Sequence, residues 1–228
     1  MNRLLAIETS GEACSVALSD HGRVTESYVH APMQHAELLL PAVREVLEGS
    51  GLAMSDLDAI AFGRGPGSFT SLRIGIGVVQ GLAWGADLPV IPVSSLAAVA
   101  QEAWERAGRS ELPVCVAMDA RMNEVFSAQF AATERGVVEA TQAETVGPAS
   151  ALLDEALPFI AAGNGFERFP ELSALRAEAA HCFHDLWPRA STVLNLAQHW
   201  LQDNEALPAA GAQPVYIRND VASKPGAV

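Results

Sequence analysis

The first half of the chain alternates short apolar runs with helix-like patterns. The run RLLAIE at residues 3–8 predicts a buried strand, and the alternating stretches 13–20 and 22–30 flank the turn SDHG, as in a β-hairpin. A helical period follows at 33–48, where Pro41 predicts a kink or a late helix start. The pattern then predicts a strand at 57–63, a helix ending near Ala86, a strand at 89–94 and a helix at 95–108. This half therefore has the order βββαβαβα.

The second half begins in the same way. The run PVCVAMD at residues 113–119 is again an apolar strand that ends in a carboxylate, and two strands around a turn follow it. The remaining pattern predicts a helix at 149–156, a strand at 157–162, an irregular segment at 163–190 and a helix from Ser191 to about Asp203. The repeated order indicates an internal duplication. We therefore expect an α/β protein of two lobes, residues 1–108 and 109–228, in which Glu8 and Asp119 end equivalent strands.

Two such units side by side are the plan of the ASKHA superfamily (actin, sugar kinases and chaperone ATPases), which has two tandem RNase H-like lobes with ATP in the cleft between them. There, each lobe supplies a strand–Asp-x-Gly hairpin whose backbone N–H groups surround phosphate. Here the first strand continues as ETSG, with the glycine one position late, and the sixth as DAR, with no glycine. No P-loop lysine follows the glycine-rich loop. We therefore expect a vestigial cleft marked by Glu8, Asp119 and Arg121, without a cofactor; an ATPase or kinase acting in this cleft is the alternative.

The stretch FGRGPGSFTSLRIGIGVVQGLAWG, residues 62–85, contains seven glycines. Its first part predicts a loop in which Gly63, Gly65 and Gly67 permit turn dihedrals and Pro66 fixes one φ angle. Ser68 is placed to cap the following helix, whose N-terminus could also bind an anion. Four glycines lie inside that helix, where each costs about 0.5–1 kcal/mol relative to alanine.

A helical projection of this segment gives two apolar faces. One is the expected core stripe: Phe69, Leu72, Ile76, Val79 and Ala83. The opposite face carries small and apolar residues, whereas a surface helix should carry charged residues there. The helix at 33–48 likewise has more apolar residues than one core-facing stripe needs. Either a partner helix covers this surface, or the helix is buried within its own domain. The predicted partner-binding residues are His35, Leu38, Leu39, Ala42, Thr70, Ile74, Gly77, Val78, Gly81 and Gly85.

Composition narrows the possible functions. The formal net charge of -13 argues against a surface that binds nucleic acid directly, because such a surface needs clustered Lys and Arg. Three cysteines without a CxxC motif indicate thiols in a reducing cytoplasm, and we expect neither a signal peptide nor a membrane span. HExxH, HxxxH and GxSxG are all absent, so we expect no metal site and no serine-hydrolase nucleophile.

Four stretches together carry a family resemblance: AIETS (6–10), GPGSFTSLRIG (65–75), MDARMNEVF (118–126) and PVYIRN (214–219). They resemble the TsaB (YeaZ) family, the non-catalytic subunits of the bacterial machinery that makes N6-threonylcarbamoyladenosine at adenosine 37 of tRNA. The resemblance extends over nearly the whole chain. One departure is Ser71, where the family usually has glycine.

The resemblance implies several partners. Members of this family form a homodimer alone and a heterodimer with the catalytic paralogue TsaD, which the ATPase TsaE joins; tRNA is bound only through the complex. TsaD-like proteins carry an HxxxH metal motif, which this sequence lacks. The family's dimer interface involves the first two helices of the first lobe, which are the helices that the projection singles out.

Overall fold

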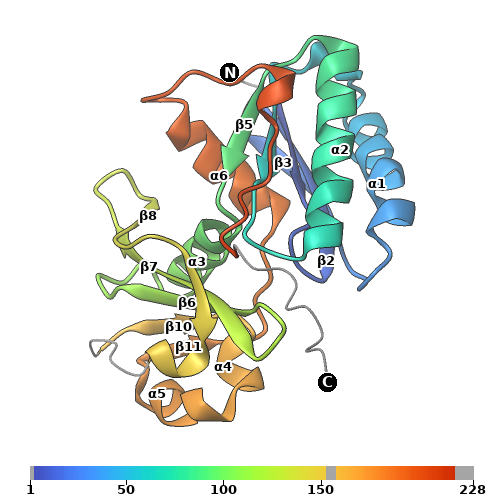
Figure 1. Cartoon of the computed structure of the whole chain (residues 1–228). Helices are drawn as coiled ribbons and strands as arrows, with labels where there is room; N and C mark the ends of the chain where they lie inside the picture. The colour runs from blue at the N-terminus through green and yellow to red at the C-terminus, as the bar shows by residue number, and fades with distance from the viewer. Residues whose placement is uncertain (1–2, 153–157, 219–228) are drawn as a thin grey trace, which may run out of the picture.

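The computed structural model describes residues 3–152 and 158–218, which form two lobes with one mixed sheet each (Figure 1). The strands of the first sheet are β1 (Arg3–Glu8), β2 (Ala13–Asp20), β3 (Arg23–His30), β4 (Ala59–Gly63) and β5 (Val90–Val93). Those of the second are β6 (Val114–Asp119), β7 (Glu124–Ala132), β8 (Val138–Ala140), β9 (Thr145–Pro148), β10 (Ile160–Ala162) and β11 (His181–Phe183).

The two sheets share one topology. The first has the order β3-β2-β1-β4-β5, and the second has the order β8-β7-β6-β10-β11, with β9 added beside β7. In the first sheet, β1 pairs antiparallel with β2 and parallel with β4. In the second sheet, β6 pairs antiparallel with β7 and parallel with β10. The predicted duplication is therefore confirmed, and the fold is an α/β pair of tandem RNase H-like lobes of the ASKHA plan. Glu8 and Asp119 end the equivalent strands β1 and β6.

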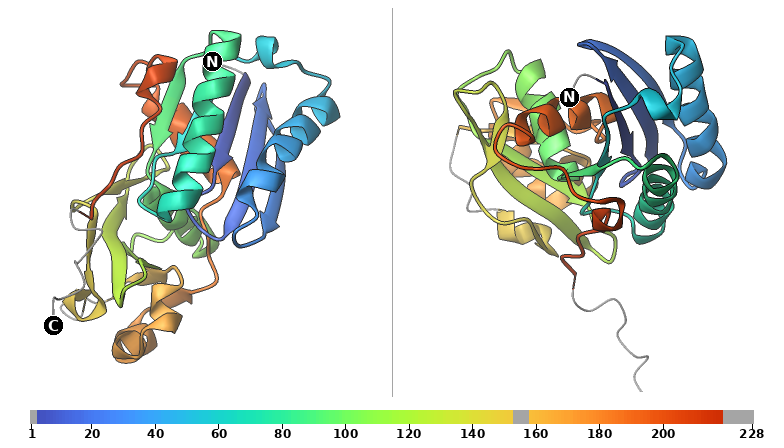
Figure 2. Two further views of the ribbon diagram at one scale, coloured as in Figure 1. Left: turned by 45° about the vertical axis from the view of Figure 1, so that its right-hand side comes forward. Right: turned by 90° about the horizontal axis from the view of Figure 1, so that it is seen from above.

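Helices cover both faces of the first sheet. Helices α1 (His35–Ser50) and α2 (Phe69–Ala86) lie side by side on its outer face (Figure 2). On its inner face lies α6 (Ala190–Trp200), which buries Val193 and Leu194 against the apolar strands β1 and β4. Since α6 comes from the end of the chain, the first lobe is completed by residues far from it in sequence.

The second sheet is completed in the reciprocal way. Its inner face is covered by α3 (Ser95–Arg106), where Val99 and Ala103 pack in one core with Val116 and Ile160. Its outer face is covered by the short helices α4 (Gly165–Arg168) and α5 (Ser173–Glu178). All strands of the first sheet precede residue 108, and all strands of the second follow it. The helices do not keep to this division, because α3 packs on the second sheet and α6 packs on the first.

Several local predictions are wrong. The segment 163–190, expected to be irregular, contains α4, α5 and β11, whose few residues each are too short to show a period. The helix expected at 149–156 is a 3-10 turn, η2 (Ala149–Leu152), and the rest of that prediction lies outside the described residues. Helix α1 begins at His35, so Pro41 lies inside the helix and does not delay its start.

Candidate partner-binding face and interlobe cleft

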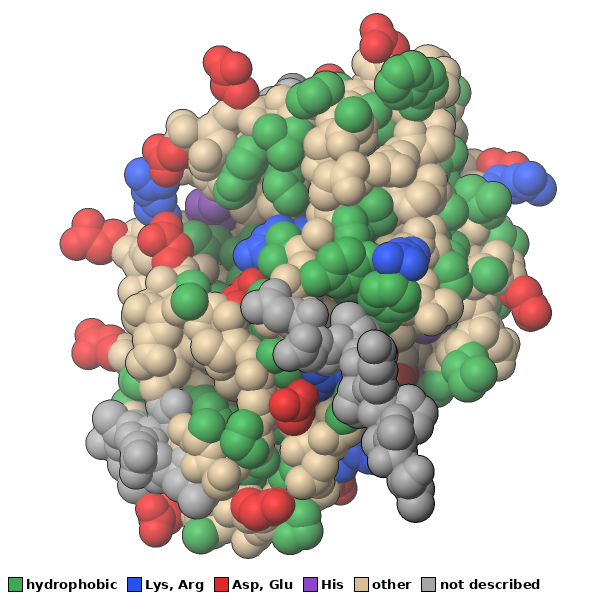
Figure 3. Space-filling model, viewed as in Figure 1, with side chains coloured by type: hydrophobic (Ala, Val, Ile, Leu, Met, Phe, Trp, Pro, Cys, Tyr) green, Lys and Arg blue, Asp and Glu red, His purple; other side chains and the backbone are tan. Residues whose placement is uncertain are grey.

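The three glycines that repeat along α2 face outward. Gly77, Gly81 and Gly85 are exposed, and a Cβ atom added at any of them would have no neighbouring heavy atom within 4 Å. Figure 3 shows mainly hydrophobic and uncharged surface over α2. If the chain's own domain covered this face, an added Cβ atom would meet it. The alternative of burial within the domain is therefore wrong for this chain, and the glycine stripe lies on open surface.

Apolar side chains flank the stripe. Ile74 and Val78 are half-buried, as are Leu38 and Ala42 of the neighbouring helix α1. Trp84 is 78% exposed. We use the term outer helix face for this set: Leu38, Ala42, Thr70, Ile74, Gly77, Val78, Gly81, Trp84 and Gly85.

Sequence reasoning missed Trp84. At about 100° per residue, a residue seven positions after Gly77 lies about 20° from it around the helix. The spacing was therefore a usable signal. The exposed indole of Trp84 projects from this surface, and the glycine stripe beside it forms a depression.

Three predictions for these two helices need correction. His35 is 2% exposed, and its Nε2 atom lies 3.2 Å from the backbone oxygen of Ala13. Leu39 is fully buried against the first sheet. Neither side chain is on the outer helix face, because the first turns of α1 direct them into the core. Phe69, expected in the core, is exposed and lies beside the ring of Tyr216.

The earlier glycines of the motif face inward. A Cβ atom added at Gly67 would lie 2.4 Å from the backbone oxygen of Ser10, and one at Gly75 would lie 2.1 Å from Thr9 Oγ1. Both positions allow the loop and α2 to pack directly on the segment after β1. These two glycines let neighbouring segments of the chain approach each other closely. The sequence-based prediction, which considered only turn dihedrals, did not include this role.

The loop itself departs from the prediction at three positions: Gly63, Gly67 and Ser68. Only Gly65 among its glycines has a left-handed backbone, with φ of 93°, so the argument from turn dihedrals is correct there alone. Ser68 precedes the first residue of α2 as predicted, but its side chain caps no backbone N–H; its Oγ instead accepts a hydrogen bond from Ser71 Oγ at 3.0 Å. The helix start is therefore held by packing and backbone contacts.

A cleft of about 730 Å³ lies between the lobes. Asp119 and Arg121 line it as predicted, but Glu8 does not. Glu8 is 1% exposed and accepts hydrogen bonds from the Ser10 N–H at 2.5 Å and the Ser95 hydroxyl at 2.8 Å. Burial raises the pKa of this carboxyl even though those hydrogen bonds act to lower it. Glu8 is therefore an internal structural group that no cleft ligand touches.

The first phosphate hairpin is filled by the protein's own side chains. A Cβ atom at Gly11, in the β1–β2 turn, would lie 2.6 Å from Trp187 Cε3, and Pro188 lies beside it. The indole of Trp187 also stacks on His30, with 5.7 Å between ring centroids. Because an aromatic ring occupies the space above this turn, its backbone cannot surround a phosphate as an Asp-x-Gly hairpin does.

The second hairpin is also occupied. Asp119 forms ion pairs with Arg168, whose Nε lies 2.8 Å from Asp119 Oδ2, and with Arg121, whose Nη1 lies 3.4 Å from the same oxygen. Arg121, Met122 and Asn123 all have left-handed backbones, with φ angles of 63°, 54° and 61°, which non-glycine residues adopt rarely. The side chains of Arg121 and Met122 in this turn line the cleft. In a nucleotide-binding hairpin, backbone N–H groups face the cleft instead. Sequence reasoning missed Trp187 and Arg168, which are distant from the hairpins along the chain.

Other candidate sites are few. Within residues 3–152 and 158–218, no three His, Cys, Asp or Glu side chains are arranged to hold a metal ion. Burial raises the pKa of the Cys14 thiol to about 11, which keeps it protonated and unreactive. In the same part of the chain, every helix is too short or too polar to cross a bilayer.

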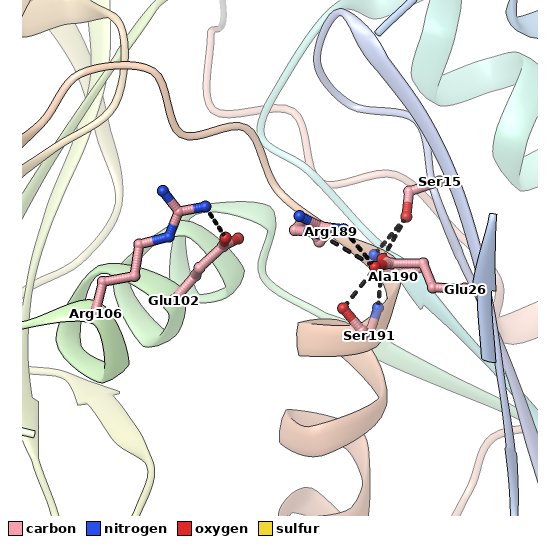
Figure 4. A network of polar contacts seen from close by, with 7 residues as sticks. All are labelled: Ser15, Glu26, Glu102, Arg106, Arg189, Ala190 and Ser191. Atoms are coloured by element: carbon pink, nitrogen blue, oxygen red, sulfur yellow. Dashed lines mark hydrogen bonds and ion pairs between the residues drawn. The ribbon is translucent and has the colours of Figure 1, made fainter. Parts of the chain in front are cut away.

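A polar network attaches α6 to the first sheet (Figure 4). Glu26 of β3 accepts hydrogen bonds from Arg189 Nη2 at 2.7 Å and from both the N–H and the hydroxyl of Ser191, at 3.1 and 3.0 Å. Burial opposes ionisation of Glu26, but these hydrogen bonds outweigh it and hold its pKa below the ordinary range. On α3, burial raises the pKa of Glu102, although Arg106 donates to it. The carboxylate at position 26 thus stabilises the N-terminus of α6.

Known proteins resemble this chain over most of its length. Residues 29–213 match the family described as "TsaD: tRNA N6-adenosine threonylcarbamoyltransferase". The chain is 38% identical to the "tRNA threonylcarbamoyladenosine biosynthesis protein TsaB" of Escherichia coli K12, over 97% of each chain. It is also 38% identical to the protein of the same name from Haemophilus influenzae, over 97% of this chain and 95% of that one.

A solved structure agrees with these matches. The structure titled "YeaZ from Pseudomonas aeruginosa" is 42% identical in sequence, with a TM-score of 0.84, and the alignment covers 95% of this chain and all of that one. Sequence and fold therefore agree from the first strand to the C-terminal segment, and the chain belongs to the TsaB (YeaZ) family.

Proposed function

We propose that this chain takes part in the biosynthesis of threonylcarbamoyladenosine in tRNA as a non-catalytic subunit that binds a TsaD-like catalytic subunit. The names of its relatives support the pathway. The observation that carries the subunit role is the outer helix face. A Cβ atom added at Gly77, Gly81 or Gly85 would meet no heavy atom of the described residues within 4 Å, so we propose that packing of another molecule recovers the helix propensity that these glycines sacrifice.

The shape of this face suits a partner of the same fold. In a two-fold antiparallel pair of α2 helices centred between Gln80 and Gly81, Trp84 of each copy lies over Gly77 of the other. A self-complementary surface of this kind explains a homodimer when the chain is alone. A TsaD-like subunit, whose family matches most of this chain, would replace one copy with its equivalent helices.

Features of the cleft support a non-catalytic role. Trp187 fills the first hairpin and Arg168 and Arg121 neutralise Asp119, so neither phosphate-binding turn retains the arrangement that hydrolysis needs. The alternative, an ATPase or kinase acting in this cleft, is less well supported, because the turn after β1 packs on Trp187 and, among the described residues, Asp119 is paired with Arg168 and Arg121.

The remaining partners follow from the resemblance and the charge. A chain with net charge -13 repels phosphate, so we propose that tRNA is bound through the complex. A TsaE-like ATPase would join that complex, and a role in tRNA modification places the protein in the cytoplasm.

Reconstitution tests the proposal. The purified chain is combined with the TsaD-like and TsaE-like proteins, ATP, an activated threonylcarbamoyl donor and unmodified tRNA, and threonylcarbamoyladenosine is measured by mass spectrometry of nucleosides. We expect modification to require this chain and to stay within about twofold in Asp119→Asn. Modification without the chain would contradict the subunit role, and its abolition by Asp119→Asn in a folded protein would favour catalysis in the cleft.

A further inference from the structure

The interlobe cleft is a lined cavity with an apolar floor. Phe126 of β7 and Met118 of β6 form this floor, and Leu96 and Val99 of α3 border it but are almost fully buried. Its volume of about 730 Å³ lies within the range of about 300–1,000 Å³ that is usual for small-molecule sites. Of the residues of the outer helix face, Thr70 also lines this cavity, and the partner-binding role assigned above uses no other part of it.

The C-terminal segment, residues 213–218, forms one wall of the cleft and connects the lobes. On the first lobe, the Val215 N–H donates to the Arg64 backbone oxygen at 2.9 Å. On the second, Arg218 donates to Glu124. The stretch PVYIRN therefore closes one side of the cavity, a role that its sequence alone did not indicate.

Arg73 is a cation at this cleft without a carboxylate partner among the described residues. Its Nε atom donates to the Tyr216 hydroxyl at 2.9 Å, and its guanidinium lies 3.7 Å from the centroid of the Phe69 ring. By contrast, Arg121 and Arg218 at the same cleft are paired with Glu12 and Glu124. Arg73 thus retains guanidinium N–H groups and a positive charge that a ligand can use.

We propose that this cleft binds a small organic anion. Its apolar or aromatic body would contact the floor, and its single anionic group, a carboxylate or sulfonate, would pair with Arg73. The occupied hairpins exclude a polyphosphate, because both turns that would hold its phosphates contact Trp187 or Arg168 instead.

A fluorescence titration tests this site with anilinonaphthalene sulfonate, an aromatic anion, and its uncharged parent phenylnaphthylamine. The variants are Arg73→Gln, the matched control Arg44→Gln on the exposed side of α1, and Trp84→Ala, which reports binding of the dye to the outer helix face. Thermal unfolding of each variant checks that it is folded.

We expect one saturable site for the sulfonate and about tenfold weaker binding in Arg73→Gln, the size of one charge-assisted hydrogen bond. Arg44→Gln and Trp84→Ala should stay within about twofold of the original protein, and the uncharged dye should bind about tenfold more weakly than the sulfonate. Three results would overturn the proposal: no saturable binding, equal binding by the two arginine variants, or loss of binding in Trp84→Ala. Reconstituted tRNA modification tests the subunit role separately from dye binding. The anion-site proposal can therefore fail without the subunit proposal, and the reverse.

Discussion

Gly75 and Gly77 stand two residues apart in α2 and face opposite surroundings. A Cβ atom at Gly75 would lie 2.1 Å from Thr9 Oγ1, whereas one at Gly77 would have no neighbour within 4 Å. The difference teaches that one glycine-rich motif contains glycines of two kinds. The inward ones admit the chain's own segment after β1, and the outward ones leave space that nothing in the described chain fills.

The same contrast distinguishes the two sides of the first lobe. On the inner side, α6 covers the sheet, and its N-terminus is held by Glu26 with several hydrogen bonds. On the outer side, α1 and α2 cover the sheet but leave Trp84 and the glycine stripe exposed. Both sides contribute buried core, and we propose that the exposed part of the outer side serves association.

The largest expected effect is that of Gly67→Ala. The new methyl group would lie 2.4 Å from a backbone oxygen, which cannot rotate away as a side-chain end can. We expect a loss of about 3 kcal/mol in the free energy of unfolding, measured by denaturant titration. A loss below about 0.5 kcal/mol would show that the inward glycines are not required for close packing.

Glu26→Gln tests the polar attachment on the inner side. Loss of the charge weakens hydrogen bonds from Arg189 and Ser191, and we expect a cost of about 2 kcal/mol at neutral pH. Because the folded-state pKa of Glu26 is lowered, its contribution is present above the unfolded-state pKa and is lost as the pH falls through the folded-state pKa. The variant should therefore lose less stability than the original protein on acidification below about pH 4.

The matched control is Glu48→Gln, which removes the same charge from an exposed position of α1. Its stability should change by less than about 0.5 kcal/mol. Parallel stability–pH curves for the original protein and Glu26→Gln would contradict the assigned role of the network.

The smallest expected effect is that of Gly77→Ala, and it has the opposite sign to that of Gly67→Ala. The methyl group meets open space, and helix propensity improves, so we expect a gain of about 0.5–1 kcal/mol in unfolding free energy of the monomer. Measurement must be made at a concentration where the chain is monomeric, since association would add to the apparent stability. A destabilised monomer would place Gly77 with the inward group.

Local patterns predicted the parts of the fold that depend on period and order. The doubled strand order and the equivalent positions of Glu8 and Asp119 followed from the sequence, whereas the open surface over the glycine stripe was one of two alternatives. The prediction placed His35 and Leu39 on the partner-binding face because a helical projection cannot show which side of a helix is buried against the sheet.

The cleft was less predictable. Its character depends on Trp187 above the first hairpin and Arg168 beside the second, and only the folded chain brings these together. Glu8 was expected at the cleft, but Ser10 and Ser95 enclose it. Contacts over long sequence separations leave no periodic signal, so sequence reasoning recognised missing glycines but could not identify what replaced them.

The most direct test of the account is Gly81→Leu. The Cβ atom of a leucine at Gly81, the centre of the outer helix face, has no neighbour within 4 Å among the described residues, so the side chain would project outward and intrude on a partner helix. Gly147→Leu is the matched control, since an added Cβ atom at that position also has no neighbour within 4 Å and it lies in the second lobe. Sedimentation velocity, co-purification with the TsaD-like subunit and thermal unfolding are measured for both variants. The account predicts that Gly81→Leu is monomeric, loses the TsaD-like subunit and still unfolds cooperatively, while Gly147→Leu behaves like the original protein. A folded Gly81→Leu protein that still dimerises and binds the TsaD-like subunit normally would contradict it.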